Sequence, residues 1–138
     1  MTATDLPPVA APREGPTRIR KAIWKDMANT LAIILAVSFL FTGLPKATGQ
    51  PSAIEHGKHL GFSARNYRAL GVLQILGAAA LGLGLIWKPI GVAAAIGFTL
   101  MMAGAVIVHL RAGDPAARML PAAAFGLASI AVVVLHLR

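Results

Sequence analysis

Four long stretches of this sequence contain no charged residue, and they restrict the folds open to the chain. They cover residues 27–45, 69–87, 89–110 and 119–137, which gives lengths of 19, 19, 22 and 19 residues. A helix rises about 1.5 Å per residue, so roughly 20 apolar residues span the ~30 Å hydrocarbon core of a bilayer. A helix of a soluble bundle would instead show charged side chains on its outer face every few residues. The pattern therefore predicts four membrane-spanning helices.

The second and third stretches are separated by a single charged residue, Lys88. A connection as short as Trp87-Lys88-Pro89 forces the two helices to lie side by side and antiparallel. Pro89 suits the first turn of the later helix, where its missing N–H would have no partner in any case. We therefore predict a transmembrane hairpin at the centre of the chain.

The composition agrees with a membrane protein and excludes several other classes. Of the 138 residues, 57% are apolar, 13% are charged and none is cysteine. Soluble domains contain about 45–50% apolar and about 25% charged residues. A chain without cysteine supplies no disulfide, thiolate or iron–sulfur ligation. The formal net charge of +8 comes from Lys and Arg in the tail and connections. This distribution favours anchoring at a lipid bilayer over nucleic-acid binding.

Residues 1–22 differ from the rest of the chain. They contain four prolines and end in the basic run Arg18-Ile19-Arg20-Lys21. We expect a disordered tail here, followed by one domain over residues 23–138. The helices of that domain are expected at about residues 24–44, 64–87, 89–110 and 119–137.

Several residues mark the expected helix ends. Gly43, Pro45 and Gly49 are expected to end the first helix, and Pro121 to lie in the first turn of the last. Ser52-Ala53-Ile54-Glu55 matches a capping box, which predicts a short interfacial helix that ends near Gly61. Ser63 is expected to cap the helix that follows. The predicted fold class is an all-α, integral membrane four-helix up-and-down bundle with a short interfacial helix between helices 1 and 2.

The basic residues give an orientation. We expect a bacterial cytoplasmic (inner) membrane with both termini cytoplasmic, because the basic residues before the first helix usually dominate topology. Seven Lys and Arg then lie inside (five near the N-terminus, Lys88 and Arg138) and the other six of the 13 outside. Trp24 and Trp87 would lie at the inner interface and Tyr67 at the outer one.

Small residues four positions apart predict where the helices meet, because helices in lipid associate through close backbone approach. The pairs are Ala78 and Gly82, Ala80 and Gly84, Gly91 and Ala95, and Ala93 and Gly97.

Polar residues gather at one predicted end of the bundle, the end that also has the two longer loops. They are Lys46, Glu55, His56, His59, Arg65, Arg68, His109, Arg111 and Asp114. This asymmetry either marks a site or reflects the greater room for charge in those loops. Gln74, about two turns into the second helix, either bonds a neighbouring helix or lines a site. His109 is either a satisfied interfacial histidine or a ligand and proton-exchange group.

No metal site is predicted. His109 and His136 end consecutive antiparallel helices, so they lie at opposite membrane faces and cannot ligate one haem. His56 and His59 share a helix face, but the sequence provides no evident third or fourth ligand.

Three motifs within residues 24–137 resemble the DoxX-like family of small four-helix membrane proteins. They are Gly43-Leu44-Pro45-Lys46, then Arg68-x-x-Gly71-x-x-Gln74, and Gly104-Ala105 leading to His109-Leu110-Arg111-Ala112-Gly113-Asp114. Family members often have Glu where this chain has Gln74, so a role that needs a carboxylate there does not carry over.

The resemblance implies an accessory or quinone-linked redox subunit, since founding members look like parts of complexes that link sulfur-compound oxidation to quinone, or of oxidative-stress assemblies. Lys46, Arg68, Gln74 and His109 would then surround a quinone-like headgroup at the outer end of the bundle. The alternative is a non-catalytic assembly partner that packs on another membrane protein or on a second copy of the chain. A small transporter is disfavoured, because the sequence has no inverted repeat or broken helix. Whether the chain is an enzyme stays open.

Overall fold

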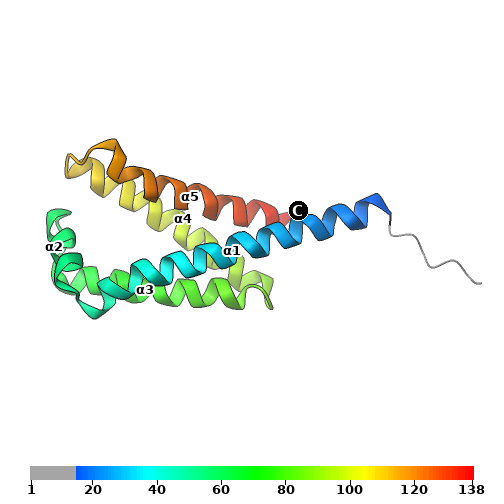
Figure 1. Cartoon of the computed structure of the whole chain (residues 1–138), viewed down its shortest axis with the longest axis horizontal. Coiled ribbons are helices and arrows are strands. Elements are labelled where there is room, and N and C mark those ends of the chain that lie inside the picture. Colours follow the sequence, from blue (N-terminus) through cyan, green and yellow to red (C-terminus); the bar gives the residue numbers. More distant parts are fainter. Residues whose placement is uncertain (1–14) are drawn as a thin grey trace, which may run out of the picture.

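The computed structural model describes residues 15–138, which form five α-helices joined by short turns (Figure 1). The helices are α1 (Pro16–Thr48), α2 (Pro51–His59), α3 (Ala64–Leu83), α4 (Lys88–Arg111) and α5 (Ala116–Leu137). The predicted all-α class is therefore confirmed. In the described part of the chain, three helices are long and apolar enough to cross a membrane, namely α1, α4 and α5. Helix α3 is not among them, because Arg65, Arg68 and Gln74 interrupt its apolar sequence.

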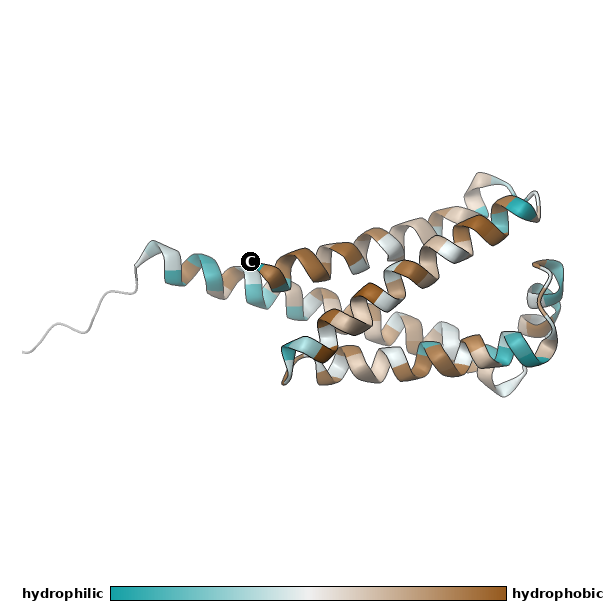
Figure 2. Cartoon of the chain, turned by 180° about the vertical axis from the view of Figure 1, so that it is seen from behind, coloured by the Kyte–Doolittle hydropathy of each residue, from teal (hydrophilic) through white to brown (hydrophobic). Residues whose placement is uncertain are grey.

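The four long helices run alternately in opposite directions, and α2 lies across one end (Figure 1). Helix α1 packs along α3, and α4 packs along α5. The two pairs diverge towards the end where α2 lies (Figures 1 and 2). Apolar residues cover the middle of the helices, and hydrophilic residues are more frequent near the helix ends and connections (Figure 2). Large apolar side chains such as Phe41 and Leu100 are 79% and 69% exposed, as expected for contact with lipid.

Two glycines determine how closely α1 and α3 approach. A Cβ atom on Gly71 would collide with the backbone N of Ala47 and lie 2.6 Å from Cβ of Lys46. A Cβ atom on Gly43 would lie 3.0 Å from Cβ of Gln74. Gly43 is therefore a contact residue within α1 and not the end of the helix, as helices in lipid pack through small residues.

Helix α1 is longer at both ends than the sequence predicted. It starts at Pro16, so the predicted disorder is wrong for residues 16–22, and the boundary between residues 22 and 23 falls inside the helix. Proline is compatible with a first helical position, where no N–H is needed. The predicted tail over residues 1–14 lies outside the described residues. The expected end at Leu44 is also wrong, because the helix continues through Pro45 to Thr48.

Three glycines with positive φ end helices in the same way. They are Gly49 (φ 73°), Gly61 (φ 88°) and Gly113 (φ 71°). After each of them the chain turns back, and the next backbone N–H donates to a carbonyl five residues earlier: Gln50 to Pro45, Phe62 to Gly57 and Asp114 to His109. This is the Schellman arrangement, which glycine adopts without steric strain. The predicted stop at Gly61 is confirmed.

Other predicted helix ends are partly right. Ser63 accepts a hydrogen bond from the Asn66 N–H and caps α3, and Pro89 lies in the first turn of α4, as predicted. The capping box is wrong, because α2 begins at Pro51, one residue before Ser52. Proline at the first helical position starts this helix without a side-chain cap.

Two further ends differ near tight turns. Helix α3 ends at Leu83 and not at Trp87. The N–H groups of the two residues after Gly84 donate to carbonyls three residues earlier, so the α-helical hydrogen-bond pattern stops there. Pro121 lies inside α5, since that helix already starts at Ala116 after the Pro115 N-cap.

The predicted small-residue contacts are right for four residues. Ala78, Gly84, Gly91 and Ala95 are buried, and a Cβ atom on Gly84 would collide with Gly91 of α4. Gly82 and Gly97 have open space around them, and Ala93 is exposed, so their expected contacts within the described chain are wrong. Beyond these contacts, the core centres on stacked Phe39 and Phe98, with ring centroids 3.7 Å apart.

Gly71→Ala tests the α1–α3 contact. We expect it to lower the free energy of unfolding by about 1–3 kcal/mol, because the new methyl group overpacks a site closed by backbone. Gly97→Ala is the matched control, since the same methyl group enters open space. The control should be neutral or stabilise by up to about 1 kcal/mol through helix propensity. Thermal unfolding in detergent, followed by circular dichroism, measures both. Equal effects of the two changes would contradict this packing.

Candidate functional site

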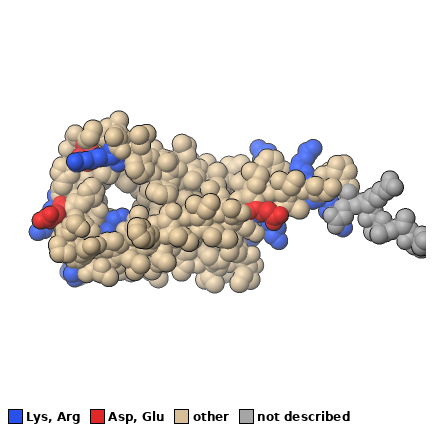
Figure 3. Space-filling view, viewed as in Figure 1, with Lys and Arg blue, Asp and Glu red and all other residues tan. Residues whose placement is uncertain are grey.

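A cavity of about 800 Å³ lies between the diverging helix pairs, close to α2. A hollow at this end of the molecule is visible in the space-filling view (Figure 3). All five helices contribute to its walls, which are mainly apolar. Phe39, Leu70, Met102, Val108 and Phe125 are examples of the apolar lining. Phe41 also lines the cavity and is 79% exposed, so the cavity reaches the outer, lipid-facing surface of α1.

Polar side chains in this cavity come from helices that are distant in sequence. The lining includes Thr42, Lys46, His56, Tyr67, Gln74, His109 and Arg118. A cavity of this size, with apolar walls and a few convergent polar groups, is typical of small-molecule sites.

Lys46 and Gln74 form the polar contact between α1 and α3. The Lys46 ammonium donates a hydrogen bond of 2.6 Å to Gln74 Oε1, and the Gln74 amide lies 3.4 Å from the Thr42 hydroxyl, to which it donates. The ammonium also lies 5.7 Å from the centre of the Tyr67 ring, within the range of a cation–π contact. The close helix approach at Gly43 and Gly71 brings these groups together.

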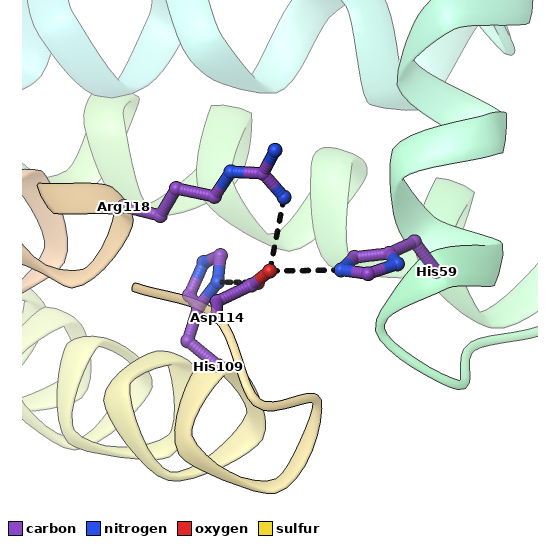
Figure 4. A network of polar contacts seen from close by, with 4 residues as sticks. All are labelled: His59, His109, Asp114 and Arg118. Atoms are coloured by element: carbon purple, nitrogen blue, oxygen red, sulfur yellow. Dashed lines mark hydrogen bonds and ion pairs between the residues drawn. The ribbon is translucent and has the colours of Figure 1, made fainter. Parts of the chain in front are cut away.

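Asp114 is the centre of a second polar network (Figure 4). Its Oδ1 accepts hydrogen bonds from His59 Nε2 at 2.8 Å and from Arg118 at 2.9 Å. Its Oδ2 accepts one from His109 Nδ1 at 2.7 Å. The carboxylate is buried, with its side chain 3% exposed. These contacts join α2, α4 and α5 through one residue of the α4–α5 turn.

Local sequence explains the position of Asp114. Gly113 turns the chain back after α4, so that the Asp114 N–H donates to the His109 carbonyl while the side chain meets the His109 ring. Arg118 lies four residues further on, in the first turn of α5, and therefore on the same side as Asp114. The hydrogen bonds from His59, His109 and Arg118 hold the pKa of Asp114 well below its ordinary value.

The network fixes the orientation of His109. Because Nδ1 donates to Asp114, the neutral ring has its lone pair on Nε2, and His109 lines the cavity. His59, at the other side of Asp114, is 47% exposed. A hydrogen-bonded path therefore runs from the cavity through a buried carboxylate to the surface.

Helix α2 closes the cavity on the side away from the bundle. Gly57 packs directly on Tyr67, since a Cβ atom there would lie 2.5 Å from Cγ of the ring. His56 of the same helix lines the cavity and lies 5.8 Å from His109, measured between ring centres. Burial, followed by the nearby His109, lowers the pKa of His56, which favours its neutral form near pH 7.

The structure brings together three of the four site residues predicted from sequence. Lys46, Gln74 and His109 line one cavity, whereas Arg68 does not line it. The Arg68 guanidinium packs against Gly49 in the α1–α2 turn. The cause is helical spacing: the buried face of α3 contains Gly71 and Gln74, and the residue one turn earlier on that face is Tyr67.

Tyr67 and Arg118 were not predicted from sequence as site residues, and His56 and Asp114 were predicted only as members of a polar cluster. Tyr67 was expected at the outer membrane interface, and its side chain is buried within the protein, with 5% exposed. Its spacing of four and seven residues before Gly71 and Gln74 is the sequence feature that would have identified it. Within residues 15–138, no group of three or more His, Cys, Asp or Glu side chains has a geometry that could hold a metal ion.

Two comparisons with known proteins found a match. The model of a family described as DoxX-like matches residues 30–132. An uncharacterized protein of Bacillus subtilis (strain 168), YdgD, is 30% identical over 80 residues, which are 58% of this chain and 70% of that protein. No solved structure matches the chain significantly.

Asp114→Asn tests the polar network. Since the folded state lowers the pKa of Asp114 below its ordinary 3.8, its stabilising contribution is present above about pH 4 and is lost as the pH falls further. We expect the variant to unfold at a lower temperature than the wild type at pH 5. Between pH 5 and pH 3 the unfolding temperature should fall less in the variant than in the wild type. Asp26→Asn is the control, because Asp26 is exposed on α1. Identical pH profiles for wild type and Asp114→Asn would contradict the assignment.

Proposed function

Because the chain belongs to the DoxX-like family of membrane proteins, we propose that it is an accessory or quinone-linked redox subunit that binds the headgroup of a quinone-type amphiphile in the cavity beneath α2. The observation on which this proposal rests is the convergence of Lys46, Tyr67, Gln74 and His109 inside a largely apolar cavity of about 800 Å³. An isoprenoid tail prefers lipid, whereas headgroup oxygens need hydrogen-bond partners.

The donor and acceptor groups suit such a headgroup. Lys46 Nζ has three N–H donors, and within the described residues it gives one, to Gln74. The Tyr67 hydroxyl forms no hydrogen bond within residues 15–138, although the residue lines the cavity. His109 Nε2 adds an acceptor when the ring is neutral. The site therefore offers both donors and an acceptor, with a route for a tail past Phe41.

A bound quinone would supply two-electron chemistry that is coupled to proton uptake. The protein's own part is to exclude water, to orient the headgroup and to hold a proton at His109. Asp114 fixes the orientation of the His109 ring, because its Oδ2 accepts a hydrogen bond from Nδ1 at 2.7 Å. His59, which is partly exposed, connects that carboxylate to water. Proton exchange between solvent and the cavity would follow this hydrogen-bonded chain from His59 to His109.

We further propose that α3 crosses the membrane together with the three more apolar helices, in a bacterial cytoplasmic membrane with both termini inside. The short turn between Leu83 and Lys88 and the buried face of α3 support four crossings. Helix α2 and the polar cavity then lie near the outer leaflet, which suits a site that exchanges protons with the outside.

A second candidate is a non-catalytic assembly partner. A Cβ atom on Gly82 of α3 or on Gly97 of α4 would meet no atom of another helix within 4 Å. Exposed glycines on membrane helices permit close approach of a further helix, from another protein or from a second copy of the chain. Retention of a partner by a protein that binds no quinone would favour this function over the first.

Gln74→Leu tests the quinone site. We expect it to weaken binding of decylubiquinone about tenfold, because the variant loses the amide and leaves Lys46 without its acceptor. Such a hydrogen bond contributes about 1.5 kcal/mol, which corresponds to about a tenfold change in the dissociation constant. Isothermal titration of the full chain in mild detergent measures the dissociation constant.

Two variants serve as controls for this titration. Gln74→Glu keeps an acceptor for Lys46 and should retain binding. Ser129→Ala removes a buried hydroxyl that bonds its own helix at Phe125 and does not line the cavity, so affinity should not change. Binding that is absent from the wild type, or equal in Gln74→Leu, would contradict the proposal.

Single cysteines test the membrane arrangement, because the chain has none of its own. A membrane-impermeant maleimide added outside intact cells should label Glu55→Cys and leave Lys88→Cys unlabelled. Labelling after lysis shows that both thiols are reactive. The opposite pattern would reverse the orientation, and equal labelling from outside would contradict a crossing by α3.

A further inference from the structure

A second cavity, of about 410 Å³, lies at the end of the molecule opposite α2. The N-terminal half of α1, the α3–α4 turn and the end of α5 form its walls. Helix α1 projects beyond the other helices here (Figure 1), and the projecting part has several Lys and Arg side chains on its surface (Figure 3). None of the residues assigned to the quinone site lines this cavity.

The lining of this second cavity is strongly basic. Lys21 and Lys25 lie one turn apart on α1, Lys88 comes from the start of α4 and Arg138 from beyond α5. Among the described residues that line the cavity, none is Asp or Glu. Asp26 lies next to Lys25 in sequence but is not part of the lining. Four basic side chains from three separate segments therefore face one space whose lining has no Asp or Glu side chain, which favours an anion there.

Apolar groups share the same cavity. Leu85 and Ile86 of the α3–α4 turn line it, and Ile86 is 90% exposed. Trp24 also lines it, and the Arg138 guanidinium lies 5.4 Å from the centre of the Trp24 ring. A tryptophan at the end of a membrane helix is typical of the headgroup region of a bilayer. A free phosphate ion would use the cations alone, whereas a phospholipid would use the cations and the apolar groups together.

We propose that this second cavity binds the phosphodiester headgroup of an anionic phospholipid. Lys21, Lys25 and Lys88 neutralise the phosphate, and basic pockets between membrane helices are known to suit such headgroups. The acyl chains lie along Leu85 and Ile86. Because the lipid contacts three segments at once, it connects α1 to the α3–α4 turn and to α5, and its binding stabilises the folded protein.

The proposal is tested by native mass spectrometry of the full chain in detergent, with equimolar dioleoyl-phosphatidylglycerol and dioleoyl-phosphatidylcholine. The wild type should retain phosphatidylglycerol preferentially. The triple variant Lys21→Gln/Lys25→Gln/Lys88→Gln should retain it at least about tenfold less, because each cation near a lipid phosphate contributes. Thermal unfolding should shift upward with phosphatidylglycerol in the wild type and not in this variant.

Two further triple variants serve as controls. Lys58→Gln/Arg65→Gln/Arg111→Gln removes the same charge from exposed residues outside both cavities, so it should retain the lipid. Lys21→Arg/Lys25→Arg/Lys88→Arg keeps the charge and should also retain it, which separates lost binding from lost folding.

Several results would overturn the proposal. They are an absence of preference for phosphatidylglycerol in the wild type, an equal loss in both charge-removing variants, and a loss in the arginine variant. Excess inorganic phosphate should leave the bound lipid in place. If phosphate releases the lipid and itself binds with the same lysine dependence, the occupant is a soluble phosphate and not a lipid.

Discussion

The close approach of α1 and α3 at Gly43 and Gly71 is the constraint on which the cavity beneath α2 depends. With no side chain at either position, the two backbones come close enough for Lys46 to reach Gln74 directly. In apolar surroundings an ammonium group and an amide are stable only when they find partners. The same residues that hold the helices together therefore supply the polar groups of the site.

The other pair of helices, α4 and α5, stands away from this contact at the α2 end (Figure 1), and Asp114 connects it back. One carboxylate accepts from His109 of α4, His59 of α2 and Arg118 of α5. A buried charge is tolerated because all of its contacts are hydrogen-bonding cations or imidazoles. The cavity is thus a space between two packed helix pairs that are joined by α2 and the α4–α5 turn. Its size follows from their divergence.

Sequence reasoning predicted the helices well because charge-free length is a direct consequence of the bilayer. It was less successful at the helix ends, since Gly43 is a contact residue and Pro45 is tolerated inside α1. For the candidate site, depth along the helices predicted Lys46, Gln74 and His109, and these three residues line the cavity. Rotation about the helix axis decides which of two neighbouring residues faces inward. The sequence alone did not predict this rotation, because it depends on the helix against which α3 packs. For that reason Arg68 was chosen where Tyr67 is the buried residue.

The most direct test is the identity of the lipid-soluble molecules that leave the protein on denaturation, after purification from bacterial membranes in mild detergent. Liquid chromatography with mass spectrometry identifies and quantifies them. The account predicts a quinone in close to equimolar amount from the wild type and a much smaller amount from Gln74→Leu. A wild-type protein that releases no quinone, or a variant that releases just as much, would contradict a headgroup site between α1, α3 and α4.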